Sequence, residues 1–125
     1  NKKWVYQVSE GKRYLFLWWL NLKAFSSAWR GYNESHMALY DKQTGETVAI
    51  AGDGLIDDID NGMTFFPQYG ICNNAMVSSV WPFELKEYIQ KKAEKGESVS
   101  NRLIALADSL DDEENPILII AHLKQ

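Results

Sequence analysis

The sequence has little of several features that would narrow its function. Its 125 residues include one cysteine and two histidines. A single cysteine excludes an internal disulfide, and so few Cys and His side chains disfavour a metal site built on several of them. No apolar stretch approaches the roughly 20 residues of a membrane-spanning helix, since Arg13 and Asn21 bracket the longest run. The 13 basic residues are scattered, whereas a nucleic-acid footprint is a basic patch or stripe. We therefore expect no membrane span and no nucleic-acid partner.

Familiar catalytic motifs are also missing. The sequence has no Gly-x-Ser-x-Gly nucleophile elbow, phosphate loop or dinucleotide fingerprint. Cys72 has no His/Asp arrangement around it, so we interpret it as a small buried hydrophobe rather than a nucleophile. His36 and His122 have no second histidine at ligand spacing, and we predict structural or surface roles for both.

The composition is that of a folded domain with much β structure. Hydrophobic residues make up 46% of the chain and charged residues 24%, with a net charge of −4, which is ordinary for a globular protein. The five Trp, six Tyr and five Phe favour pleated, half-buried surfaces. We expect a single unit over residues 1–125.

Three β-hairpins are predicted within residues 1–81. In the first, strands 4–8 and 13–22 flank a turn; the second strand is apolar on both faces, which predicts an interior position. In the second, the turn after Asp41 closes through that side chain and Gly45. A third, shorter hairpin turns at Asn73-Asn74, a dipeptide that tolerates left-handed geometry.

A helical pair is predicted over residues 82–110, followed by a final strand over 116–124. Pro82 suits the first turn of a helix and Gly96 its end. Ser98 or Ser100 caps the second helix. The uniformly apolar final segment predicts a buried strand that pairs with one far back in the sequence.

The acidic bend, residues 54–67, carries three carboxylates within four positions: Asp57, Asp58 and Asp60. They could ligate calcium, which takes several oxygen ligands, although the EF-hand pattern fails because Ile59 occupies its third position. Paired carboxylates also suit a glycosidase. The structural alternative is that they accept backbone amides within the bend.

An aromatic loop follows the first hairpin, with Phe25, Trp29, Arg30 and Tyr32. Aromatic faces provide large contact areas at low entropic cost, so the loop could bind a carbohydrate or peptide. The alternative is that these side chains fill the space between sheets.

Four segments together resemble a known family: ALYDKQTGE, LIDDIDNGMTFFPQYG, ELKEYI and ENPILIIAHLK. The combination, over residues 32–124, resembles the C-terminal part of secreted bacterial six-bladed β-propellers, similar to NHL-repeat proteins. Asn61-Gly62 departs from the paired glycines usual in that family. The resemblance implies an extracytoplasmic protein and a chain that is a fragment holding about two blades.

These observations predict a mainly β protein with antiparallel, propeller-blade-like hairpins and an inserted helical pair near the C-terminus. The leading functional hypothesis is a non-catalytic binding or scaffold role in an extracytoplasmic propeller. One alternative is a metal-dependent propeller hydrolase or lactonase acting on a sugar-like substrate. Another is an interaction domain that forms homo-oligomers through exposed strands.

Overall fold

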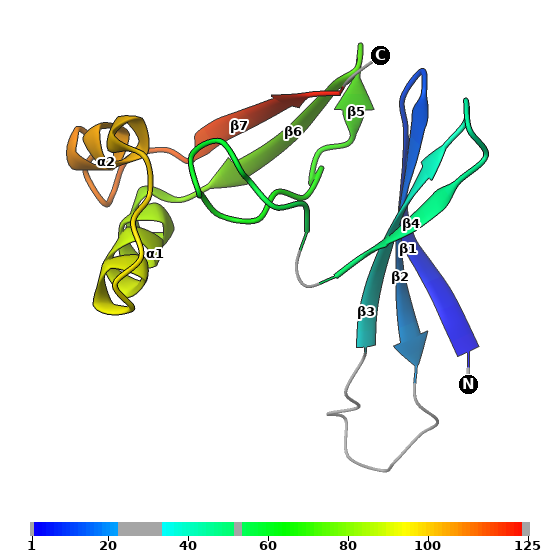
Figure 1. The fold of residues 1–125 in the computed structure, drawn as a ribbon, viewed down its shortest axis with the longest axis horizontal. Coiled ribbons are helices and arrows are strands. Elements are labelled where there is room, and N and C mark those ends of the chain that lie inside the picture. The colour runs from blue at the N-terminus through cyan, green and yellow to red at the C-terminus, as the bar shows by residue number, and fades with distance from the viewer. Residues whose placement is uncertain (1, 23–33, 52–53, 124–125) are drawn as a thin grey trace.

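The described part of the chain forms two antiparallel sheets and two helices, as a computed structural model shows (Figure 1). The structure describes residues 2–22, 34–51 and 54–123. A four-stranded sheet comes first in the chain and a three-stranded sheet follows, with the helices inserted before the last strand. The elements are β1 (Lys2–Glu10), β2 (Tyr14–Leu22), β3 (Glu34–Asp41), β4 (Thr47–Ile50), β5 (Ile71–Cys72), β6 (Ala75–Val80), α1 (Pro82–Glu94), α2 (Asn101–Asp108) and β7 (Ile117–His122).

The larger sheet has the order β1-β2-β3-β4, so β2 lies in its interior as predicted. Side chains alternate between the two faces of a strand, which places Trp18 and Trp19 on opposite sides. Trp18 packs edge-on against Phe66 with ring centroids 4.9 Å apart, while Trp19 stacks on His36 at 5.5 Å. Each tryptophan thus has its own packing partner.

The predicted turn chemistry is confirmed in the β3–β4 and β5–β6 hairpins. Asp41 Oδ1 accepts the Gln43 amide at 2.9 Å, and Gly45 adopts a φ of 76°. In the β5–β6 hairpin Asn73 and Asn74 adopt φ values of 48° and 62°. Two left-handed residues give the turn that best matches the twist of paired strands.

The start and end of α1 and the start of α2 lie at the signals expected from the sequence. Pro82 opens α1, where its missing amide costs nothing, and Gly96 follows its end with a φ of 75°. Ser100 caps α2 by accepting the Leu103 amide at 3.1 Å. The two candidate caps are thereby resolved in favour of Ser100.

A shared core joins the two sheets. Phe16 and Met37 from the larger sheet pack with Met76 from the smaller sheet and with Phe65 from the acidic bend. A second cluster of Val80, Leu85 and Ala107 packs the helices against the end of the smaller sheet. One face of the smaller sheet is covered in this way.

Two burial predictions are wrong. β7 pairs with β6, the strand that precedes the helical pair in the sequence, but β7 is buried on one face only. On its other face, Leu118 and Ile120 are 63% and 56% exposed. The reason is that the bend, the larger sheet and the helices all pack on the opposite face of this sheet. Cys72 is exposed because it lies next to the tight β5–β6 turn.

Candidate functional site

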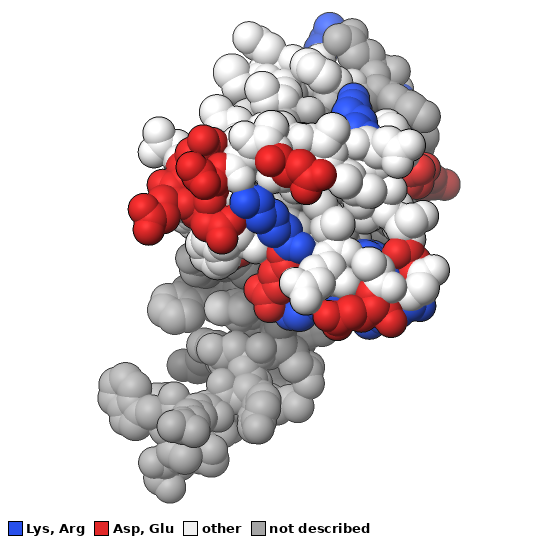
Figure 2. Space-filling model, turned by 90° about the vertical axis from the view of Figure 1, so that its left-hand side faces the viewer, with Lys and Arg blue, Asp and Glu red and all other residues white. Residues whose placement is uncertain are grey.

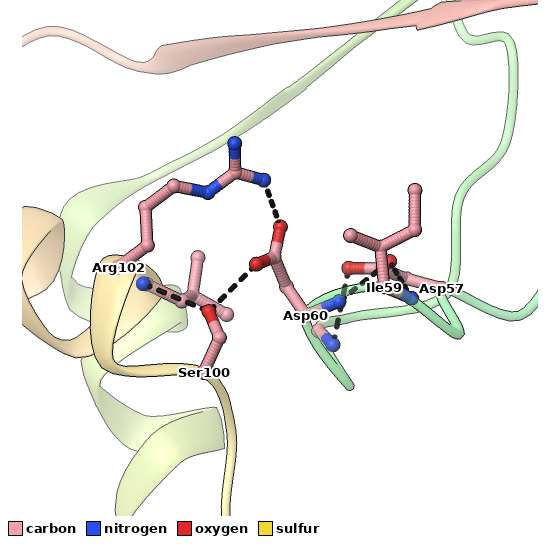
Figure 3. A network of polar contacts seen from close by, with 7 residues as sticks. Asp57, Ile59, Asp60, Ser100 and Arg102 are labelled. Carbon is pink, nitrogen blue, oxygen red and sulfur yellow. Dashed lines mark hydrogen bonds and ion pairs between the residues drawn. The ribbon is translucent and has the colours of Figure 1, made fainter.

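The acidic bend is held together by Asp57 (Figure 3). Its Oδ1 accepts the backbone amides of Ile59 at 3.1 Å and Asp60 at 3.2 Å, and its Oδ2 accepts that of Gly62 at 3.1 Å. A Cβ at position 62 would lie 2.6 Å from Asp57 Oδ2, so any other residue there would displace this carboxylate. The carboxylate of Asp57 therefore fixes the course of the bend.

Asp60 ties the bend to the start of α2. Its Oδ1 accepts the Ser100 hydroxyl at 2.6 Å, and its Oδ2 forms an ion pair with Arg102 (Figure 3). The Ser100 amide also donates to the Asp60 carbonyl at 2.9 Å. The Arg102 guanidinium, together with the Ser100 hydroxyl, lowers the pKa of Asp60, because both favour the charged carboxylate.

Further hydrogen bonds attach the same bend to α1 and to the segment that precedes α2. Asn61, at a φ of 53°, donates its side-chain amide to the Ser98 carbonyl at 2.8 Å. The Tyr88 hydroxyl of α1 donates to the Gly62 carbonyl at 2.8 Å.

On the side of the molecule that carries the helices, acidic and basic side chains lie interspersed (Figure 2).

These contacts support the structural interpretation of the carboxylates. Asp57 uses both oxygens on backbone amides and Asp60 uses both on Ser100 and Arg102, while Asp58 is exposed. Within residues 2–22, 34–51 and 54–123, no three metal-binding side chains are grouped to hold an ion. The calcium and glycosidase hypotheses stay predictions that this geometry does not favour.

The predicted aromatic platform lies outside the described residues. Phe25, Trp29, Arg30 and Tyr32 all belong to the segment 23–33. A role for them in binding a carbohydrate or peptide stays a prediction from the sequence.

A different apolar surface lies on the open side of the smaller sheet, and we call it the outer face. On β7, Leu118 and Ile120 point to this side, opposite the core residue Ile119. The exposed Tyr69 joins it by bonding its hydroxyl to Ser79 Oγ on β6 at 2.9 Å. The outer face is thus defined by Tyr69, Trp81, Phe83, Leu118 and Ile120, which are all exposed.

Trp81 and Phe83 extend the outer face towards α1. Trp81 continues the alternation of β6 beyond Ser79, with an extended backbone. Its ring stacks on Phe83 with centroids 6.4 Å apart, and both side chains remain about half exposed. The sequence does not reveal this surface, because the uniformly apolar β7 has no alternating pattern. The available signal was the pair of aromatic residues on either side of Pro82.

The fold defines a mainly β module of two antiparallel sheets with a helical pair between its last two strands. The chain belongs to the family described as a domain of unknown function, DUF4934, whose model matches residues 1–122. No curated protein matches the chain. Among the described residues no helix is long and apolar enough to cross a membrane.

A structural neighbour has the same fold over most of the chain. It is a "putative exported protein" of Bacteroides fragilis, with a TM-score of 0.53 and 20% sequence identity. The match covers 94% of this chain and 30% of that one, so the chain spans under a third of the neighbour's length.

These comparisons correct the propeller assignment. The family model over residues 1–122 is DUF4934, and neither it nor the neighbour indicates a six-bladed or NHL-repeat family. The described residues form two separate sheets of four and three strands and no closed ring. Hairpins joined by tight turns are common to many antiparallel folds, so the segments that suggested a propeller specify local structure only.

Proposed function

We propose that this chain has a binding role in an exported protein and that it binds another protein surface through the outer face. The observation that carries the proposal is a set of five exposed side chains: Leu118 and Ile120 on β7, Tyr69, which is bonded to Ser79 of β6, and the stacked rings of Trp81 and Phe83 where β6 leads into α1. Contiguous exposed apolar patches mark interaction sites on soluble proteins. Aromatic residues are also enriched at the centres of protein interfaces.

The side-chain chemistry of the outer face favours a protein over a sugar. Leu118 and Ile120 offer no hydrogen-bonding group, and the Tyr69 hydroxyl is already bonded to Ser79. A partner that covers these side chains gains mainly by removing apolar area from water. An apolar protein surface meets that requirement.

The likeness to the Bacteroides fragilis protein supports a location outside the cytoplasm. That neighbour is more than three times as long as the matched region, because the match covers 30% of it. We propose that the chain acts as one module of an exported protein, in which the outer face is covered.

Chemical labelling of introduced cysteines tests the proposal. Leu118→Cys and Leu106→Cys are each made in a Cys72→Ser background, because Cys72 is exposed and would react. The protein isolated from the cells that make it is then treated with a bulky maleimide. Leu118 is 63% exposed and the control Leu106, on α2, is 40% exposed. Without a partner, Leu118→Cys would therefore react at least as fast as Leu106→Cys.

We expect Leu118→Cys to react several-fold more slowly than Leu106→Cys, because a partner shields the outer face. After denaturation both variants should label equally, which controls for the reactivity of each thiol. Faster labelling at position 118 in the native protein would refute the proposed binding surface.

A further inference from the structure

Among the residues that the structure describes, no strand pairs with the outer side of β7, which is therefore an open edge of the smaller sheet (Figure 1). The Leu123 amide donates to the Asn74 carbonyl at 2.8 Å, on the side of β6. Backbone groups of an antiparallel strand point alternately to its two sides. The amides and carbonyls of Leu118, Ile120 and His122 therefore point away from β6, where another strand could pair with them.

This edge lacks the protection that other edges carry. Natural edge strands are blunted by lysine, proline, bulges or short length. β1 has a register shift between Val5 and Gln7, and β4 has only four residues. The segment Ile117–His122, in contrast, contains no Lys, Arg, Asp, Glu or Pro and pairs with β6 without a shift.

Opposite charges lie at the two ends of β7. Asp111, Glu113 and Glu114 are exposed just before the strand begins. At the other end the β1–β2 turn approaches, since a Cβ on Gly11 would lie 3.6 Å from Leu123 Cδ1. The next residue of that turn, Lys12, is exposed.

From this arrangement we infer that β7 pairs antiparallel with β7 of a second copy of the chain. The two three-stranded sheets then form one continuous sheet, and Leu118 lies opposite Ile120 of the second copy on the joined outer face. The pairing brings the acidic end of each strand to the basic end of the other. Because both copies use the same surface, the assembly closes at two.

The inference goes beyond the proposed function, because it concerns the edge of the smaller sheet and not its outer face. Adding a strand to an exposed edge supplies main-chain hydrogen bonds, while the alternate side chains provide specificity. Here the alternate side chains are the exposed Leu118 and Ile120. Leu118 of each copy contacts Ile120 of the other. A second copy therefore satisfies the backbone groups of the edge and gives Leu118 and Ile120 apolar neighbours on one side, while the joined outer face stays open.

Light scattering behind size exclusion, over a range of concentrations, tests the pairing on this chain and two lysine variants. Ile120→Lys places a charge on the β7 edge, and Val48→Lys makes the same change on the edge strand β4. The two positions are comparable, with exposures of 56% and 59%. Circular dichroism checks that each variant folds.

We expect a dimer for the unchanged chain and for Val48→Lys, and a dissociation constant at least about tenfold higher for Ile120→Lys. Ile120→Pro should have the same effect, because it removes an amide that points away from β6 and leaves the β6–β7 ladder intact. A monomeric chain, an open-ended series of oligomers, or equal effects of the two lysine variants would each overturn the inference.

The outcomes for the two proposals are distinguishable. If the chain is monomeric while Leu118→Cys remains shielded in the native protein, the β7 pairing is wrong and the binding role of the outer face stands. If Leu118→Cys labels freely in the native protein while the dimer forms, the proposed function is wrong.

Discussion

Asp57 and Asp58 are adjacent residues with the same side chain and different surroundings. Asp57 accepts three backbone amides, whereas Asp58 is exposed and no hydrogen bond or ion pair is recorded for it among the described residues. We expect Asp57→Ala to lower the free energy of unfolding by about 1–3 kcal/mol, because it leaves partly buried amides without an acceptor. Urea denaturation measures this change.

Asp58→Ala is the matched control for that measurement. A surface substitution away from specific contacts changes stability by no more than about 0.5 kcal/mol. A calcium site in the bend predicts a different result: Asp58→Ala would be as destabilising as Asp57→Ala when calcium is present and not when it is absent. That result would show an ion site and contradict the structural interpretation of the bend.

At the scale of elements, the Arg13–Asp41 pair fixes the start of β2 against the end of β3. Arg13 donates to both carboxylate oxygens, with Nη2 2.6 Å from Oδ2 and Nε 3.1 Å from Oδ1. The hydrogen bonds from Arg13 lower the pKa of Asp41 from 3.8 to about 2. A carboxylate with a lowered pKa stabilises the fold above its unfolded pKa, and that stability is lost as the pH falls through the folded value.

We therefore predict that the melting temperature falls as the pH decreases from about 4 to about 2. Arg13→Gln should flatten this dependence, because Asp41 then titrates closer to its unfolded value. Lys91→Gln is the control, since its ion pair with Glu87 is exposed at both side chains. Identical pH profiles for the unchanged chain and Arg13→Gln would contradict the assignment.

The elements that the sequence predicts well are those specified by local chemistry. Asp41 and Gly45, Asn73-Asn74, Pro82 and Gly96 each act within their own turn or cap, and each is found in the expected place. The structural role of Asp57 was likewise foreseen, because an Asx side chain bonds to amides a few residues ahead.

Long-range relations were beyond reach of the same reasoning. The bonds from Asp60 to Ser100 and Arg102 join residues 40 and 42 positions apart, and no local pattern encodes them. The exposed face of β7 was missed for the same reason. An apolar run predicts a strand, but what covers each face depends on the placement of distant elements.

At the scale of the whole molecule, the described residues leave the outer face of the smaller sheet and the outer edge of β7 uncovered. The core clusters lie on the inner side of β6 and β7, so the outer face is on the opposite side of the same sheet. The free edge of β7 runs along the margin of that sheet. Three strands are the minimum for an independently stable sheet. A strand added at β7 would therefore pair the free backbone groups of this edge and extend a small sheet.

Hydrogen exchange of the β7 amides, resolved by NMR, tests this account most directly because it needs no substitution. In an open edge the amides of Ile119 and Ala121 are protected by β6, whereas those of Leu118, Ile120 and His122 exchange freely. If β7 is an interface, all five are protected to within about tenfold of one another. An alternating pattern of protected and unprotected amides at high protein concentration would show a free edge and contradict the account.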